Sequence, residues 1–177
     1  MKTLLKTSLL AFALAMALAA CGGTTINIPL DSFSISIDAT ANTVGKVVYP
    51  KDAATFEKPV VNVKTITLTG NVKSEYTAIQ APLEMKFYAR VTDPSAAGCQ
   101  DGGLVWICDA SGETAISGSY TFQNGDTQPI ELGATNPQVL ADGINAGKIW
   151  IGAEVTSGAA TNVKFSFSNM VAHVTIF

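Results

Sequence analysis

The sequence contains a single histidine, His173, so any catalysis by an imidazole side chain depends on this residue. His173 alternates with Val174 and Ile176 in a C-terminal run with the pattern of a strand, and it therefore lies on the face opposite to them. A Ser–His–acid triad needs three groups packed together, and the nearby serines, Ser166 and Ser168, belong to no Gly-x-Ser-x-Gly elbow. This pattern favours a strand histidine without a catalytic role.

Charged side chains are also scarce and are spread thinly along the chain. They make up 14% of the 177 residues, with 11 basic and 14 acidic side chains. Nucleic-acid binding requires a cluster of basic residues, and the sequence has neither such a cluster nor a glycine-rich phosphate loop or dinucleotide fingerprint. We therefore expect no nucleic-acid partner and no cofactor.

The most apolar stretch, residues 9–20, lies close to the N-terminus, after Lys2 and Lys6 and just before Cys21. This order of basic residues, short apolar segment and small residues is typical of a secretory signal. A membrane helix needs about 20 apolar residues, and no later segment is long and apolar enough to span a bilayer. We therefore expect residues 1–20 to be a cleaved signal peptide.

Leu18-Ala19-Ala20-Cys21 resembles the lipobox of bacterial lipoproteins. The resemblance implies that the signal is cut before Cys21, that its thiol carries a diacylglyceryl group, and that residues 21–25 form a lipidated tether. Gly22 is not the aspartate that retains enteric lipoproteins in the inner membrane, which favours the outer membrane. The resemblance covers only about the first 23 residues and implies nothing about the domain expected at residues 26–177.

Three cysteines are an odd number for an oxidising compartment. Because the resemblance assigns Cys21 to the lipid, Cys99 and Cys108 remain as a pair, and glycines between them allow the chain to turn back. We predict a disulfide between them; the alternative is two reduced, buried cysteines. A redox pair fits less well because the spacing is not Cys-x-x-Cys, and zinc would find only two thiols and a distant histidine.

Apolar and polar side chains alternate with a period of two through much of the remaining chain. The clearest runs are residues 83–92 and 149–155, which predict two half-buried antiparallel strands. Three other segments, 26–37, 61–68 and 163–176, alternate but change phase midway. One extra residue turns all later side chains to the other face, as in a β-bulge or a strand that crosses between layers at a sandwich corner.

Turn residues separate these runs. Asn124-Gly125-Asp126 predicts one hairpin, and residues 157–160 predict another between the last two strands. A helix of at most two turns is expected near residues 137–146, because Pro137 suits its first position and Asn136 its cap. The fold class is therefore all-β: an antiparallel, immunoglobulin-like sandwich of seven to ten strands, with a small β-barrel as the alternative.

Acidic side chains crowd the cysteine region, where Asp93, Asp101, Asp109 and Glu113 are the candidate ligands for a calcium ion. None follows the EF-hand spacing, so the pattern favours acids in solvated loops, and we predict no metal site.

Two tryptophans are further candidates for function. Trp106 lies two residues before Cys108, on the same strand face, and is expected to pack against the disulfide. Trp150 is out of phase with its apolar neighbours, so it either fills a second layer of the core, which we favour, or is exposed. In the exposed case, Trp150 and Tyr88 are the candidate aromatic residues for partner binding.

These observations favour a non-catalytic, lipid-anchored protein of the cell envelope that is structural or binds a protein or polysaccharide partner. A carrier of an apolar ligand or lipid is one alternative, and it requires an apolar cavity on the order of several hundred Å³. An envelope hydrolase is the other, and it requires two convergent carboxylates or His173 beside a serine and an acid.

Overall fold

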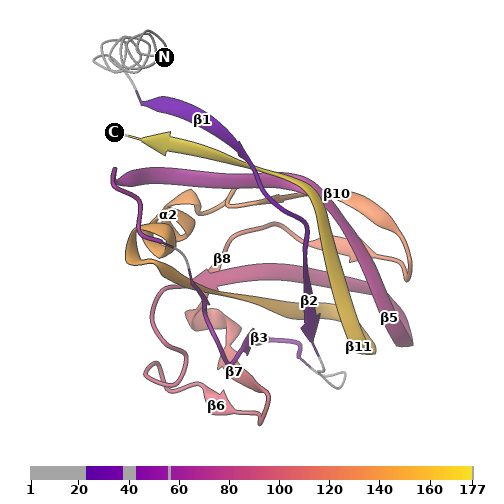
Figure 1. The fold of residues 1–177 in the computed structure, drawn as a ribbon. Coiled ribbons are helices and arrows are strands. Elements are labelled where there is room, and N and C mark those ends of the chain that lie inside the picture. Colours follow the sequence, from indigo (N-terminus) through magenta and orange to yellow (C-terminus); the bar gives the residue numbers. More distant parts are fainter. Residues whose placement is uncertain (1–22, 38–42, 56, 177) are drawn as a thin grey trace, which may run out of the picture.

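Figure 1 shows the computed structural model of the chain, which describes residues 23–37, 43–55 and 57–176. The predicted signal peptide and Cys21 lie outside these residues. Among the described residues, no helix is both long and apolar enough to cross a membrane.

The described chain forms eleven strands, all paired antiparallel, one α-helix and one 3₁₀-helix, so the predicted all-β antiparallel sandwich with one short α-helix is confirmed. The number of strands exceeds the predicted seven to ten. In chain order the elements are β1 (Thr24–Pro29), β2 (Phe33–Ile37), β3 (Lys46–Pro50), β4 (Ala54–Thr55), β5 (Val63–Arg90), β6 (Gln100–Asp101), β7 (Val105–Asp109), η2 (Ala110–Gly112), β8 (Thr114–Ala115), β9 (Tyr120–Phe122), β10 (Thr127–Leu132), α2 (Pro137–Ala146) and β11 (Lys148–Ile176).

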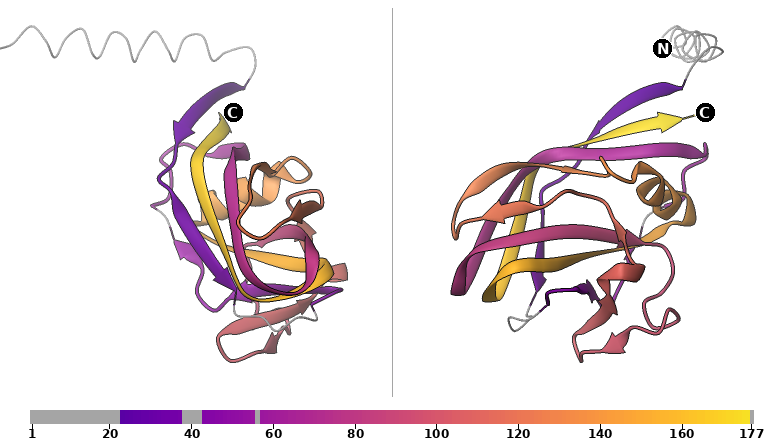
Figure 2. Two further views of the ribbon diagram at one scale, coloured as in Figure 1. Left: turned by 90° about the vertical axis from the view of Figure 1, so that its right-hand side faces the viewer. Right: turned by 180° about the vertical axis from the view of Figure 1, so that it is seen from behind.

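Two very long strands dominate the architecture. β5 has 28 residues and β11 has 29, and they pair from Trp150 opposite Arg90 to Ile176 opposite Val63. This two-stranded ribbon folds over, so that one half of each strand lies in each layer (Figures 1 and 2). Continuous strands, rather than turns, therefore join the two layers of an open sheet.

The predicted changes of phase correspond to irregularities in this ribbon. The β5–β11 register shifts between Ser168 and Val171, where Asn169 has a φ of 52°, and again between Thr175 and Ile176. The N-terminal slip falls at residues 30–32, which separate β1 from β2. These register shifts confirm that the phase changes mark irregularities in strand pairing.

Both predicted hairpins are wrong. Residues 157–160 lie within β11 and form no hairpin, since β11 stays paired with β5 through several register shifts there. Gly158, at φ 82°, accommodates the irregular backbone inside the strand. At the other site, β9 pairs with residues 83–85 of β5 and β10 with residues 68–73. The turn at 124–126 therefore connects the two layers, and it is fixed to the bend of β5 at Ser74 by two backbone hydrogen bonds.

The predicted helix is confirmed as α2, Pro137–Ala146, although its ten residues exceed the two turns expected. It ends at Gly147, whose left-handed φ of 76° lets its N–H donate to the last carbonyls. Asn136 does not cap the helix with its side chain, because its Nδ2 donates to the Ala115 carbonyl at 2.7 Å. Leu140 and Ala141 are buried and attach α2 to the core.

Aromatic side chains from both layers fill the centre of the main core. Phe165 lies 5.7 Å from Phe87 and 5.1 Å from Phe122 between ring centroids, and Phe167 lies 6.3 Å from Phe87. Each is at most 2% exposed. Burying such a side chain stabilises the fold by about 1.5–3 kcal/mol, so this cluster contributes much of the apolar packing between the layers.

The N-terminus of the described domain lies beside its C-terminus. Thr24 pairs with Ile176 and Thr25 with Thr175, so two residues of the predicted 21–25 tether belong to β1. Ile176 also pairs with Val63 at the start of β5. The start of β1, the end of β11 and the start of β5 therefore meet at one end of the molecule (Figures 1 and 2).

Candidate functional site

Three short strands and a 3₁₀-helix form a small unit that we call the disulfide lobe: β3, β6, β7 and η2. It lies at the opposite end of the molecule from the start of β1 (Figures 1 and 2). β3 attaches it to the main sheet through Val48 opposite Ala153 of β11, and β7 pairs along the other edge of β3.

A disulfide between Cys99 and Cys108 closes this lobe, as predicted. The pair is central to a second apolar cluster, separate from the main core, in which Cys108 is 4% exposed. Trp106 packs against this cluster from the same face of β7, which confirms its predicted position. The zinc alternative is excluded for this pair, because the sulfur atoms are bonded to each other and offer no thiolate.

A buried ion pair lies directly beside the disulfide. The Arg90 guanidinium donates to Glu113 Oε1 at 2.8 Å, and its Nη1 is 3.3 Å from the sulfur of Cys99 and 3.4 Å from that of Cys108. The Tyr49 hydroxyl donates to the other carboxylate oxygen of Glu113 at 2.7 Å. Burial and the Glu113 carboxylate together raise the pKa of Tyr49, so this hydroxyl stays a donor at neutral pH.

A second buried carboxylate lies on the same face of the sheet. Glu154 is 8% exposed and accepts hydrogen bonds from the Tyr88 hydroxyl at 2.5 Å and the Gly45 N–H at 2.9 Å. Burial, followed by the Glu154 hydrogen bond, raises the pKa of Tyr88. Each buried carboxylate is thus held by tyrosine and further donors within the protein, which is the arrangement of a structural network.

The four candidate calcium ligands do not form a cluster among the described residues, and each has its own partner. Asp93 binds the Ser95 side chain and backbone, Asp101 pairs with Lys51, Asp109 pairs with Lys46, and Glu113 pairs with Arg90. The Lys51 and Gly103 N–H donors lower the pKa of Asp101, and the Ser95 donors lower that of Asp93. Asp93, Asp101 and Asp109 are thus exposed acids with local partners, whereas the Glu113 side chain is only 8% exposed.

Trp150 and Tyr88 are both in the second apolar cluster, at 4% and 6% exposed. The core alternative for Trp150 is therefore correct, and the candidate role of this pair in an exposed partner-binding patch is wrong. The reason is that the disulfide lobe covers the outer face of the sheet at this point. Gly152 permits the close contact, since a Cβ there would lie 2.6 Å from the Tyr49 ring.

His173 lies between two neighbouring strands. Its ring nitrogens are hydrogen-bonded to Thr69 Oγ1 at 2.8 Å and to Asn27 Oδ1 at 2.7 Å. Neither partner is a serine or an acid, so these contacts join β1, β11 and β5 and do not assemble the predicted alternative triad.

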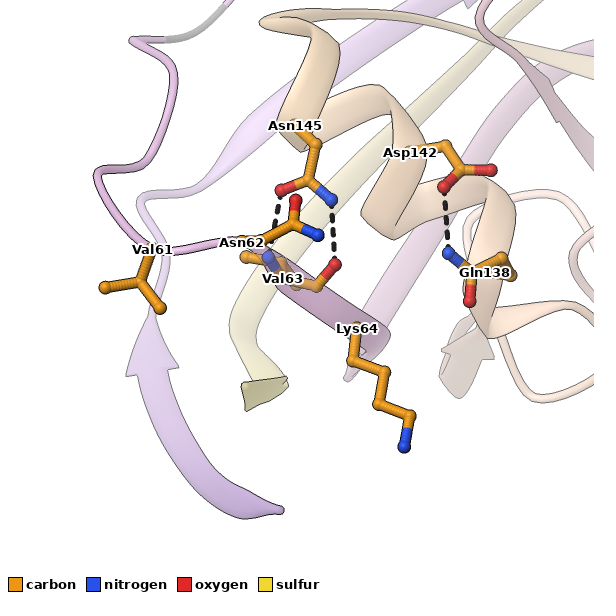
Figure 3. Close-up of a pocket in the computed structure, with 7 residues that line it drawn as sticks. All are labelled: Val61, Asn62, Val63, Lys64, Gln138, Asp142 and Asn145. Atoms are coloured by element: carbon orange, nitrogen blue, oxygen red, sulfur yellow. Dashed lines mark hydrogen bonds between the residues drawn. The ribbon is translucent and has the colours of Figure 1, made fainter. Parts of the chain in front are cut away.

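The described residues form a hollow on the disulfide lobe and another beside α2. The lobe hollow, about 290 Å³, is lined by the disulfide, Ile107, Gln100 and the Lys46–Asp109 ion pair. The helix hollow, about 490 Å³, lies between α2 and the start of β5. Figure 3 shows that the Asn145 amide occupies its wall by pairing with both backbone groups of Val63, at 2.9 and 2.7 Å. Both hollows are open and partly polar.

Arg90, Tyr49 and Glu154 were not singled out from the sequence. One signal was available in the sequence. Tyr88 and Trp150 are large aromatic residues on strand faces that the alternation otherwise predicts to be solvated. Two aromatic residues beside charged ones on one face are a sign of a second covering layer.

The chain matches no known protein-family model and no curated protein. Several solved structures resemble it weakly. The Bacillus endospore appendages described as disulfide-linked pili match at 13% identity and a TM-score of 0.32, over 88% of this chain and 92% of theirs. The xylan-binding CBM22-1 domain of Paenibacillus barcinonensis Xyn10C matches at 11% identity and 0.40, over 89% and 88%. A putative sugar-binding protein of Bacteroides thetaiotaomicron matches at 11% and 0.30, over 87% and 83%. At these TM-scores, the similarities carry no inference about what this chain binds.

Proposed function

We propose that this protein is a lipid-anchored, non-catalytic component of a bacterial cell envelope, held at the outer membrane through Cys21, which is structural or binds a protein or polysaccharide partner. The single observation that carries the proposal is the sequence Leu18-Ala19-Ala20-Cys21 at the end of a signal-like apolar stretch.

Two features of the domain support export. The Cys99–Cys108 disulfide suits an oxidising compartment, where such bonds persist. β1 begins at Thr24, three residues after Cys21, so the folded domain starts where a lipoprotein anchor would end.

The disulfide lobe is the face that we propose for the partner. It lies at the end of the molecule away from β1, so it would point away from a membrane that holds Cys21. The turn between β6 and β7 presents Leu104 at 76% exposure, and elsewhere on the lobe a hollow combines the apolar Ile107 with the Lys46–Asp109 pair. An exposed apolar residue beside polar groups is suitable for a protein or polysaccharide surface.

The buried groups favour binding over catalysis or transport. Glu113 and Glu154 are held by internal donors, and Glu154 is buried, while Glu113 also lines the lobe hollow. A carrier needs an apolar cavity between the layers, whereas the described centre is filled by the phenylalanine cluster around Phe87. These observations disfavour both alternatives.

Intact mass of the membrane-extracted protein tests the anchor. We expect a chain that begins at Cys21 and carries acyl groups, with Cys99 and Cys108 alkylated only after reduction. A Cys21→Ser variant should leave the membrane fraction. An unacylated chain that still fractionates with membranes would contradict the proposal.

Photo-crosslinking tests the partner face. A photoreactive amino acid at Leu104 is expected to capture an envelope component in intact cells, and the same group at the exposed Thr127 of β10 is the matched control. Equal capture from both positions, or capture from Thr127 alone, would contradict the assignment of this face.

A further inference from the structure

Four exposed aliphatic side chains lie along β1 and on the loop before β5, and we call them the anchor-end patch. Val60 is fully exposed at 104%, Ile28 is 44% exposed, Ile26 is 43% and Val61 is 39%. Isolated exposed aliphatic residues are ordinary in soluble domains, but several at one end of a molecule indicate a contact surface.

Strand pairing brings these residues to the same end. Thr24 is opposite Ile176, and Ile176 is opposite Val63, so the loop that carries Val60 and Val61 adjoins the start of β1 (Figure 1). Among the described residues, β1 pairs only with β11, which leaves its other edge free.

Ile26 and Ile28 lie opposite the buried Val174 and Ala172 of β11. Residues directly opposite in an antiparallel pair share a face of the sheet, so Ile26 and Ile28 extend the core face to this free edge. An apolar surface here is therefore continuous with the core.

The distance from the anchor decides what covers this patch. Only Gly22 and Gly23 separate Cys21 from Thr24, and three extended residue steps span at most about 10 Å. Acyl chains on Cys21 would hold this end of the domain within that distance of the bilayer. The patch would then face lipid on every membrane-bound copy.

The charged residues near the anchor-end patch neither oppose nor drive its contact with lipid. The exposed charged neighbours include Glu57 and Asp142 as acids and Lys58 and Lys64 as bases, which balance. Lysine stems can lie along apolar surface while their ammonium groups reach the headgroups. Binding should therefore depend on apolar insertion, and it should be insensitive to salt and to anionic lipid.

We propose that the anchor-end patch docks on the lipid surface, so that the domain is seated on the membrane with the disulfide lobe pointing outward. This inference rests on the lipid anchor of the proposed function, and it adds a defined orientation to it.

Tryptophan quenching by brominated acyl chains tests the docking. The acylated Val60→Trp protein is reconstituted into vesicles of zwitterionic phosphatidylcholine, with or without brominated chains, and wild-type emission is subtracted. Acylated Leu104→Trp is the matched control, because Leu104 is also an exposed loop residue, at 76%, in the lobe. We expect bromination to quench the new emission of Val60→Trp, at low and high salt alike, and to leave that of Leu104→Trp unchanged.

The outcomes separate the two proposals. Protein that does not float with vesicles overturns the lipid anchor, and the docking with it. Protein that floats while Val60→Trp is unquenched, or is quenched no more than Leu104→Trp, overturns the docking alone. Val60→Trp emission that follows protein density in the vesicles but not bromination indicates contact between two copies, and it also overturns docking on lipid.

Discussion

Removal of Arg90, the last residue of β5, should be among the most destabilising single substitutions around the disulfide. Its partner Glu113 has a side chain only 8% exposed, and Arg90 itself is 13% exposed. In Arg90→Met, the carboxylate would keep only the Tyr49 hydroxyl as a donor. Breaking a buried pair in this manner costs about 3–5 kcal/mol, a large part of a total stability of about 5–15 kcal/mol.

The chain contains a matched exposed pair as a control. Lys73 and Glu75 form an ion pair at 2.7 Å, close to the 2.8 Å of Arg90 and Glu113, but both side chains are 46% exposed. Exposed pairs contribute little, because water and salt screen them. We therefore expect Lys73→Met to leave the urea midpoint nearly unchanged.

Urea unfolding of the mature chain, with Cys21→Ser to remove the lipid, measures these differences. A cycle with Arg90→Met, Glu113→Gln and the double variant isolates the pair, and the double variant should lose less than the two single variants together, because no charge is then left buried alone. If Arg90→Met shifts the midpoint no further than Lys73→Met, or if the cycle is additive, burial of this pair does not have the role that we assign to it.

Three further predictions concern the disulfide, the ribbon bend and the tyrosines. Replacing Cys99 and Cys108 with serine should lower the free energy of unfolding by about 2.5–3 kcal/mol, the entropy of closing a ten-residue loop, and reduced wild type should match the variant in urea. Gly70→Ala should cost about 1–3 kcal/mol, since its Cβ would lie 2.2 Å from Met170 Sδ and 3.0 Å from Met170 Cα, while Gly112→Ala, with no atom within 4 Å, should be neutral in the same assay. The raised pKa of Tyr88 stabilises the fold below about pH 10, and this contribution is lost as the pH rises further. The difference in unfolding free energy between wild type and Tyr88→Phe should therefore shrink between pH 8 and pH 11; an unchanged difference would refute the assignment.

The fold class was predictable because alternation with a period of two depends on local geometry. Runs 83–92 and 149–155 predict strands, and the structure pairs residues 85–90 of β5 with residues 150–155 of β11. The phase changes also carried information, since a bulge is visible in the sequence wherever the pattern slips.

The hairpins were not predictable for a related reason. A turn-rich segment such as 157–160 has the same composition whether it reverses the chain or forms an irregularity inside a bent strand. Its outcome depends on whether β5 follows β11 across the bend, as it does here, with Gln80 opposite Ala159. Such a long-range pairing leaves no local mark in the sequence.

The buried ion network was not predictable under the assumption that the polar face of each strand is exposed to solvent. Glu154 and Arg90 are on the polar side of the alternation, which predicts that both are solvated. In the structure both lie beneath the disulfide lobe. Tyr49 comes from β3, about 40 residues before Arg90 in the chain, and only the fold brings the two side chains together.

The polar side of the alternation did contain one signal, Trp150 and Gly152, which are a large apolar ring and a position without a side chain two residues apart. Solvent-facing positions do not need that combination, whereas a covering layer does: the ring provides apolar surface, and the glycine leaves room for the Tyr49 ring. Where a strand's polar face holds an aromatic residue and a glycine two positions apart, a second layer should be expected over it, and the charged residues beside them should be examined as a buried pair.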